Sequence, residues 1–286
     1  MTQPRKIDFG QRLVSKAELA LLDKRVLFTA PRHYAGNLAR YLVERGARPV
    51  WMPTIAIYPL DDYTDFDRAL QNLGDYAWVA LTSLMGSQAF VNRLRETGLG
   101  SETAKKTRIT AFGPDSIPLD QLGIKPDLVP GVSYPSVMLG EMVKIGPPGG
   151  RVLVPVPEVR DVTEPFVIPE FISELERAGM VPHRVPAYMT IATSEANQTA
   201  RASLLAGEID ITVITSSAEI FSLLDQLDGD RAVVNRTTVA FMGEYTARTG
   251  REMGINVDIL PQEFSMPGLV AAIEDHFRYG CCPKTG

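Results

Sequence analysis

The sequence repeats a series of four segments, and this repeat constrains the fold more than any other feature. RVLFTAP is matched by RVLVPVP, and AWVALTS is matched by ITVITSS. The paired segments are Arg25–Pro31 with Arg151–Pro157, Leu38–Tyr58 with Phe171–Ile191, Tyr76–Leu94 with Asp210–Leu227, and Arg108–Pro130 with Thr238–Pro261. Because the matched segments keep the same order, they indicate an internal duplication. The sequence therefore predicts two similar domains.

Buried-strand patterns alternate with amphipathic helix patterns along the chain. Residues 77–83 and 108–113 read as strands, and residues 135–145 read as a helix. This alternation is typical of α/β folds with parallel sheets. By composition, the glycine-rich stretch Gly146–Gly150 resembles a linker between domains. The proline-punctuated segments Pro53–Pro59 and Pro186–Thr193 suggest a different division.

Composition limits the classes of partner. The chain has 286 residues, is 45% hydrophobic, and carries a net charge of -5 with a pI near 5.4. This charge argues against a nucleic-acid or anionic-membrane partner. No apolar run approaches the roughly 18 residues of a membrane span, and no secretory signal is recognisable at the N-terminus. The only cysteines, Cys281 and Cys282, are adjacent, so we expect no disulfide framework and a cytoplasmic location.

Hydroxyl residues gather where predicted strands end and helices begin. Thr82 and Ser83 follow one strand, and Thr215, Ser216 and Ser217 follow its counterpart. Ser116 and Thr246 each lie three residues after a glycine, Gly113 and Gly243. Ligands of α/β sheets bind beyond the carboxyl ends of the strands, where helix N-termini attract carboxylates or phosphates. The same residues are also the ones that cap helix N-termini, so both interpretations stay open.

Several common chemistries lack their motifs. Neither repeat has a G-x-G-x-x-G turn after its first strand, and no Walker loop is present. The histidines His33, His183 and His276 are scattered without metal-ligand spacing, so we expect no metal. The sequence also lacks the G-x-S-x-G motif, the turn that presents a nucleophilic serine in α/β-hydrolases.

Tyr188, in RVPAYMTIAT, is the side chain that we single out for proton chemistry. A tyrosine can donate a hydrogen bond or a proton without a metal. The alternative is an aromatic anchor for a strand between domains. Arg32, Arg160 and Arg248 lie near strand ends or in first helical turns, where they could meet a charged ligand or form surface salt bridges.

Together, these features resemble the uroporphyrinogen-III synthase family, from Arg25 to His276. The resemblance is carried by the Thr-Ser strand ends, the GIKPDLVP and GINVDILP segments, VPAYMT, and the GEYTA turn with its partner GPDS. It implies two Rossmann-like, flavodoxin-like domains joined by a two-stranded linker. The first would comprise residues 1–52 plus 190–286 and the second residues 53–189. The glycine-rich stretch then becomes an ordinary loop of the second domain.

The resemblance also implies a reaction that needs no cofactor. Hydroxymethylbilane, a linear tetrapyrrole with eight carboxylates, loses its terminal hydroxyl as water. The resulting azafulvene attacks the substituted carbon of ring D, and fragmentation and reclosure of the spiro intermediate give uroporphyrinogen III. Tyr188 matches the tyrosine proposed to assist departure of the hydroxyl, and Thr246 matches the threonine of the Gly-x-x-Thr turn. A monomer that meets the upstream hydroxymethylbilane synthase transiently is implied as well.

The chain departs from the family pattern at a few positions. Ser116 replaces the usual threonine, with Pro118 close behind it, and Met189 stands where a basic residue is common. The two alternative functions are a non-catalytic ligand-binding or regulatory protein with the same fold and a nucleotide-dependent transferase. The missing phosphate loop disfavours the transferase.

Overall fold

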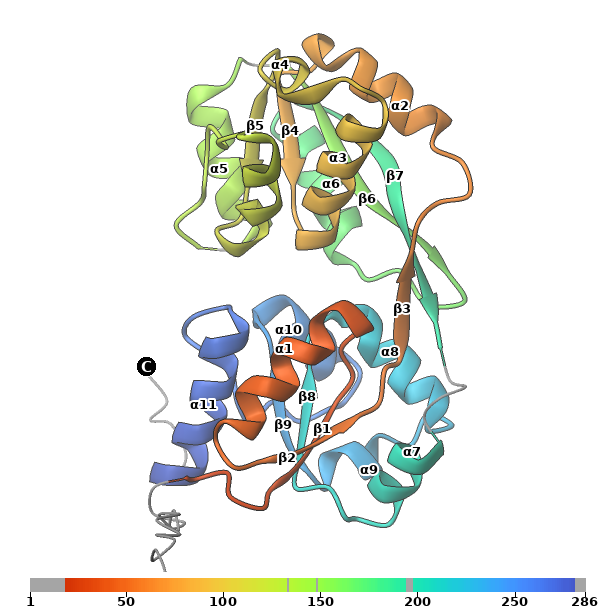
Figure 1. The fold of residues 1–286 in the computed structure, drawn as a ribbon, viewed down its shortest axis with the longest axis vertical. Helices are drawn as coiled ribbons and strands as arrows, with labels where there is room; N and C mark the ends of the chain where they lie inside the picture. Colours follow the sequence, from red (N-terminus) through yellow and green to blue (C-terminus); the bar gives the residue numbers. More distant parts are fainter. Residues whose placement is uncertain (1–18, 133, 148, 194–197, 281–286) are drawn as a thin grey trace, which may run out of the picture.

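The structure is a computed structural model that describes residues 19–132, 134–147, 149–193 and 198–280. Its strands form two separate sheets, shown one above the other in Figure 1. Cys281 and Cys282 lie outside the described residues.

The lower sheet is entirely parallel and has the order β2-β1-β8-β9. Its strands are β1 (Arg25–Phe28), β2 (Arg48–Trp51), β8 (Ile211–Ile214) and β9 (Thr238–Phe241). These strands come from two distant parts of the chain, since β1 lies between β2 and β8. The interior residues of β1 and β8 are fully buried and apolar or Thr, as expected of parallel strands covered on both faces.

Helices cover both faces of the lower sheet. One core cluster joins α1 (Arg32–Val43) and α11 (Met266–Tyr279) to the sheet, and the other joins α7 (Gln198–Leu205), α8 (Ser217–Gln226), α9 (Arg231–Asn235) and α10 (Glu244–Glu252). We call this sheet with its helices the lower body.

The upper sheet has the order β3-β7-β6-β4-β5. Its strands are β3 (Ile55–Tyr58), β4 (Trp78–Leu81), β5 (Arg108–Ala111), β6 (Arg151–Arg160) and β7 (Val181–Ala192). Only β3 is antiparallel, and it pairs with the last residues of β7, from Met189 to Ala192. Figure 1 shows this pair running between the two bodies.

The helices of the upper sheet also form two layers. One core cluster involves α2 (Thr64–Gln71), η1 (Leu73–Asp75), α3 (Leu84–Glu96), α4 (Gly100–Ala104) and η2 (Pro114–Leu122), and the other involves α5 (Pro135–Ile145) and α6 (Val167–Arg177). We call this sheet with its helices the upper body. The prediction of an α/β fold with mainly parallel sheets is confirmed, and so are the bounds predicted for α5.

One predicted helix has a different geometry. The segment after Gly113 is a 3-10 helix, η2, rather than an α-helix. It contains Pro114 and Pro118, and Pro118 has no N–H to bond the carbonyl four residues earlier. Because η2 starts just after the carboxyl end of β5, Ser116 lies at that end of the upper sheet.

Candidate functional site

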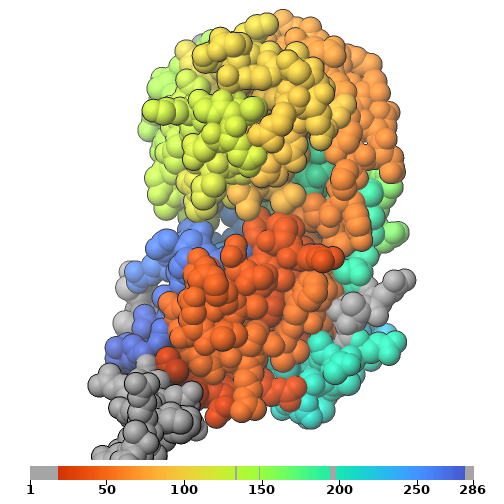
Figure 2. Space-filling model, viewed as in Figure 1, coloured from red at the N-terminus to blue at the C-terminus, as the bar shows by residue number. Residues whose placement is uncertain are grey.

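The carboxyl ends of the two sheets face each other across a groove between the bodies (Figures 1 and 2). From above, the groove is bordered by the starts of α3, η2, α5 and α6, and from below by the starts of α1 and α10. Ligand sites of α/β sheets lie at such strand ends. The groove is therefore the candidate site.

Tyr188 lies in β7 with its side chain packed into the upper core, and 9% of the residue is exposed. The pairing of β6 with β7 shifts between Val156 and Pro157, which leaves Ala187 as an extra residue just before Tyr188. Such a bulge re-aims the following side chain, here toward the start of α3. The Tyr188 hydroxyl lies 3.2 Å from Ser83 Oγ. Burial raises the pKa of Tyr188 to about 12, although the hydrogen bond with Ser83 acts in the opposite direction.

Ser83 has two functions at once. It is the N-cap of α3, and its Oγ accepts the Gly86 N–H at 3.0 Å. Both interpretations of this hydroxyl thus hold: Ser83 caps the helix and contacts Tyr188. Thr82, directly before it, is half-buried, and its hydroxyl makes no hydrogen bond to the described residues.

Asp115 lies in the GPDS segment, in the first turn of η2. Its carboxylate accepts the backbone N–H of Leu84, the residue after Ser83. Burial raises the pKa of Asp115 to about 7, and this single hydrogen bond only partly opposes the rise. The charge of Asp115 in turn raises the pKa of Tyr188. Our sequence prediction named Gly113 and Ser116 on either side of Asp115 and missed the acid itself.

The two predicted residues beside Asp115 behave differently. A Cβ added to Gly113 would meet no atom within 4 Å, so the space beside this glycine is open. The Ser116 hydroxyl donates to the Gly113 carbonyl at 2.7 Å and thereby closes the first turn of η2. Ser116 therefore stabilises the turn, and Gly113 borders free space.

In the lower body, Thr215 and Ser216 surround a buried acid, Glu219, that our sequence prediction missed. The Glu219 carboxylate accepts the Thr215 N–H at 2.8 Å, the hydroxyls of Thr215 and Thr29 at 2.5 Å each, and the Ser216 hydroxyl at 3.0 Å. Glu219 has no exposed surface, and burial raises its pKa despite these bonds. The hydroxyls of Thr215 and Ser216 thus donate to a carboxylate of the protein.

The remaining predicted residues of the lower body lie at the starts of α8 and α10. Ser217 Oγ accepts from Thr249 at 2.8 Å, inside the contact between these two helices. Gly243 lies beside the Phe264 ring, which a Cβ would approach to 3.4 Å. Thr246 is 7% exposed, and its hydroxyl makes no hydrogen bond to the described residues. Of these three residues, Thr246 is the one whose hydroxyl neither donates nor accepts a hydrogen bond among the described residues.

The start of α1 brings Arg32 and Tyr34 to the groove. Arg32 is exposed and makes no ion pair with the described residues. Burial raises the pKa of Tyr34, and the charges of Asp115, Tyr188 and Glu219 raise it further. Tyr34 packs against the lower core and is influenced by acidic groups of both bodies. The sequence offered no signal for this position, because its partners lie more than 80 residues away along the chain.

Aromatic and charged side chains also join the two bodies. Tyr134 and Phe166 of the upper body contact Tyr245 of the lower, with ring centres 5.5 and 6.4 Å apart. Arg248 makes two bonds of 3.0 and 2.9 Å to Glu170, and its guanidinium lies 4.2 Å from the centre of the Phe166 ring. We call these five residues the clasp.

The salt-bridge interpretation is confirmed for two arginines. Arg248 also pairs with Glu252, and Arg160 pairs with Glu158 and Asp61. Neither guanidinium is free to meet a ligand without giving up a carboxylate.

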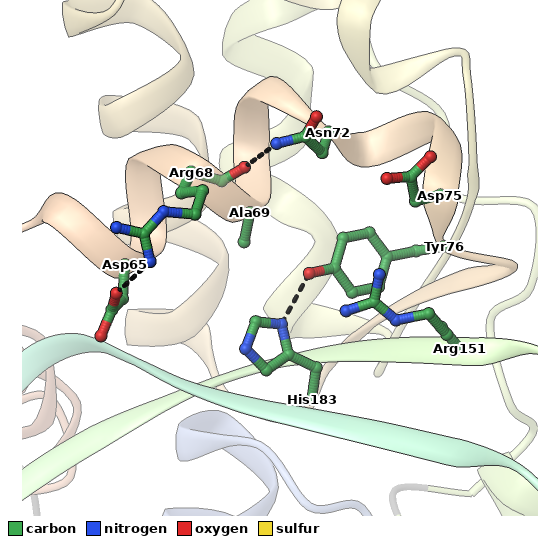
Figure 3. Close-up of a pocket in the computed structure, with 8 residues that line it drawn as sticks. All are labelled: Asp65, Arg68, Ala69, Asn72, Asp75, Tyr76, Arg151 and His183. Atoms are coloured by element: carbon green, nitrogen blue, oxygen red, sulfur yellow. Dashed lines mark hydrogen bonds and ion pairs between the residues drawn. The ribbon is translucent and has the colours of Figure 1, made fainter.

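A separate pocket of about 180 Å³ lies at the amino ends of β6 and β7, away from the groove (Figure 3). In it, the Tyr76 hydroxyl lies 2.6 Å from His183 Nδ1, and Arg151 stacks over the Tyr76 ring at 4.6 Å. Its other arginine, Arg68, pairs with Asp65 at 2.8 Å. Tyr76 with His183 and Arg68 with Asp65 thus satisfy part of the polar groups of this pocket.

Across residues 19–280, apart from the gaps given above, no three His, Cys, Asp or Glu side chains are grouped so that they could hold a metal ion. Within the same residues, no helix is long and apolar enough to span a membrane.

Residues 36–271 match the family model of uroporphyrinogen-III synthase HemD. The chain belongs to the uroporphyrinogen-III synthase family. This match covers the groove residues of both bodies, except for Arg32 and Tyr34 at the start of α1.

Curated relatives carry the same family name. The chain is 26% identical over 258 residues to the uroporphyrinogen-III synthase of Chlorobaculum parvum, covering 89% of this chain and 100% of the relative. It is 25% identical over 271 residues to that of Synechococcus elongatus, covering 92% and 98%. It is also 24% identical to the porphyrin biosynthesis protein HemD of Ruminiclostridium josui, over 82% of this chain but only 45% of that longer protein.

Solved structures of the family share the fold. A mutant uroporphyrinogen III synthase from Thermus thermophilus superposes with a TM-score of 0.64 at 17% identity, covering 88% of this chain and 97% of that one. The wild-type enzyme in another crystal form gives a TM-score of 0.50 at 19% identity, covering 88% and 96%. At these identities the likeness concerns the fold alone.

Proposed function

We propose that the chain catalyses the closure of hydroxymethylbilane to uroporphyrinogen III with inversion of ring D. Family membership supports this activity over a non-catalytic binding role. The observation that carries it within the structure is the contact of the Tyr188 hydroxyl with Ser83, at the start of the helix α3 that borders the groove. A hydroxyl pair of this kind can guide a proton to a leaving hydroxyl.

The groove supplies what a substrate with eight carboxylates requires. The helix starts at α1, α3 and α10 direct backbone N–H groups and positive dipole ends toward the space between the bodies. Thr82 and Thr246 have uncommitted hydroxyls on opposite sides of the groove, and Arg32 adds a free positive charge. Gly113 leaves room for a ligand to approach the backbone. We assign these four residues to carboxylate binding, with Gly243 shaping the start of α10.

Thr215, Ser216, Ser217 and Ser116 have a different part in the proposal. Their hydroxyls form hydrogen bonds with Glu219, Thr249 or the Gly113 carbonyl. These bonds stabilise the helix starts that we propose to bind substrate. Their contribution to binding is then made through backbone N–H groups. Tyr188 remains the proposed catalytic residue.

Catalysis would come mainly from positioning. The bilane must be held as a loop, so that the azafulvene carbon reaches the substituted carbon of ring D before the unsubstituted one. Holding two reacting groups in one geometry removes much of the entropic barrier. The reaction exchanges no electrons with an acceptor, so it requires no redox cofactor.

We also propose a division into residues 1–52 with 190–286 and residues 53–189, linked by β3 and the end of β7. The strand order supports the internal duplication behind this division. Each repeat contains four strands, numbered here by their place within the repeat. The lower sheet has the order 2-1-3-4, in which strands 1 and 2 (β1, β2) come from the first repeat and strands 3 and 4 (β8, β9) from the second. The strands β7-β6-β4-β5 of the upper sheet have the same 2-1-3-4 order. Here strands 1 and 2 (β6, β7) come from the second repeat and strands 3 and 4 (β4, β5) from the first.

We propose that the chain acts as a cytoplasmic monomer that receives bilane from the upstream hydroxymethylbilane synthase by transient contact. The groove is built entirely from one chain, so a monomer suffices for the proposed site. The bilane also closes without an enzyme, to isomer I, so rapid transfer between the two enzymes would favour isomer III.

The isomer assay tests the function. Bilane made fresh by the upstream synthase is mixed with the full-length protein, and the uroporphyrinogens are oxidised and separated by chromatography. We expect isomer III to predominate. If only isomer I forms, at the rate of the protein-free control, the catalytic proposal is wrong and the chain at most binds the bilane.

A further inference from the structure

We propose that Asp115 is the carboxylic acid that donates a proton to the departing hydroxyl of the bilane, with Tyr188 beside it. The proposal rests on the function proposed above. It adds a catalytic residue that the sequence motifs did not indicate.

The geometry ties Asp115 to Tyr188 through two successive residues at the start of α3. Ser83 contacts the Tyr188 hydroxyl at 3.2 Å, and the next backbone N–H, that of Leu84, is donated to the Asp115 carboxylate. Asp115 comes directly after the carboxyl end of β5, in the first turn of η2. Both acidic groups are thus fixed at the same end of the upper sheet, facing the lower body.

The surroundings of Asp115 contain acids and phenols. Tyr188 lies on the same body as Asp115, and the charges of Asp115 and Glu219 raise the pKa of Tyr34 in α1 of the lower body. Among the described residues, Asp115 forms no salt bridge, and a single backbone N–H is its hydrogen-bond donor. A carboxylate that is half-buried with one donor and no cation is poorly stabilised. Compared with water, this site shifts the balance toward the neutral acid.

Relative acidity decides which group supplies the proton. Burial raises the pKa of Asp115 to about 7, whereas the pKa of Tyr188 is raised to about 12. An acid serves best when its pKa lies near the working pH, and the difference between the two groups is roughly five orders of magnitude in acidity. Tyr188 then orients the leaving hydroxyl by hydrogen bonding, and Asp115 gives the proton.

The step balances without another reactant. The Asp115 proton goes to the hydroxyl oxygen, the C–O bond breaks with its electron pair leaving on water, and the pyrrole nitrogen pair forms the azafulvenium. Asp115 becomes a carboxylate that faces this cation. After the spiro intermediate has rearranged, closure at the unsubstituted carbon of ring D releases the C–H proton of that carbon. Asp115 takes up this proton and is restored to its acid form.

Asp115→Asn tests the proposal in the full-length protein with freshly made bilane. The amide keeps the shape and can still accept the Leu84 N–H, but it cannot donate an acidic proton. We expect kcat for isomer III to fall at least about 100-fold, within the usual range for a general acid, with KM little changed. Asp120→Asn is the matched control, because Asp120 is exposed on the same helix. It should leave kcat unchanged.

The pH profile separates proton donation from a structural role. Because the acid form is the active one, wild-type kcat should decline as the pH rises through about 7. The residual activity of Asp115→Asn should lack this decline. A wild-type kcat that is constant from about pH 6 to 8.5 overturns the proposal whether or not the variant folds.

The outcomes distinguish the two proposals. If the wild type forms isomer III and Asp115→Asn keeps its kcat within about threefold, Asp115 is not the acid and the proposed function stands. If the wild type forms no isomer III, the proposed function fails and the role of Asp115 fails with it.

Discussion

At the scale of residues, the Tyr188 hydroxyl can be removed with little effect on packing. Tyr188→Phe keeps the ring in the upper core, and Ser83 keeps its bond to the Gly86 N–H. We expect kcat for isomer III to fall about 10- to 100-fold, while the free energy of unfolding falls by only about 1 kcal/mol for the lost hydrogen bond.

Steady-state kinetics and thermal melts measure the two effects of this substitution. Tyr279→Phe is the control, since Tyr279 is 74% exposed at the end of α11. Equal kcat values in the two variants would remove Tyr188 from the mechanism.

The residues of the groove show how far sequence reasoning reaches at this scale. Ser83 and Tyr188 were predicted from motifs and meet in the structure. Asp115, Tyr34 and Glu219 were missed, because their roles depend on burial and on partners distant in sequence. An aspartate in a turn or a glutamate in a first helical turn is ordinary in a sequence. Only the fold shows that Asp115 has no cationic partner among the described residues and that Glu219 is fully buried.

At the scale of elements, Gly250 sets how closely α10 packs on β9. A Cβ at Gly250 would lie 2.5 Å from Cζ of Phe241. Alanine gains about 1 kcal/mol over glycine in helix propensity, but overpacking a core costs about 1 to 3 kcal/mol. We therefore expect Gly250→Ala to lower the free energy of unfolding by about 1 kcal/mol and to shift the start of α10.

Gly36→Ala is the matched control in α1, where an added Cβ meets no atom within 4 Å. This substitution should raise the free energy of unfolding by about 0.5 to 1 kcal/mol. Denaturant unfolding of both variants gives the comparison. Stabilisation by Gly250→Ala would mean that α10 moves away from Phe241 without cost.

Elements were predictable where local chemistry decides them. Pro135 at the first position and Gly146 after the last one mark α5 in the sequence, and the structure has the same bounds. The bulge at Ala187 was not predictable, since it depends on the pairing of β6 with β7. That bulge nevertheless decides where the side chain of Tyr188 points.

At the scale of the whole molecule, the clasp connects the two bodies in addition to the β3–β7 pair. Its aromatic contacts and the stacked arginine each contribute about 0.5 to 1.5 kcal/mol, and its exposed ion pair contributes at most about 1 kcal/mol. The sum is enough to bias an equilibrium between open and closed arrangements, and small enough for substrate to change it.

We expect the double variant Tyr245→Ala/Arg248→Ala to have a larger radius of gyration by small-angle scattering and a higher KM for bilane. The unfolding temperature of each body should change little, since the clasp residues lie at the surface between them. Arg40→Ala, which removes an exposed i,i+4 pair on α1, is the control. An unchanged radius of gyration would show that the β3–β7 pair alone sets the distance between the bodies.

The overall architecture was predictable in class, because alternating strand and helix patterns specify parallel sheets. The assignment of strands to sheets was not predictable from periodicity, since each sheet combines parts of both repeats. The resemblance to a family supplied the crossing of the chain between bodies.

The lower sheet has a consequence for synthesis on the ribosome. β1 and β2 emerge early, yet β1 pairs with β8, whose partner residues lie about 185 positions later. The strands of the upper sheet are all made in between, from residue 55 to residue 192. The upper body can therefore fold during translation, while the first 52 residues wait for the C-terminal part. A ribosome stalled after β7 would display one finished sheet and a β1–β2 segment whose edge toward β8 is still unpaired and therefore prone to aggregation.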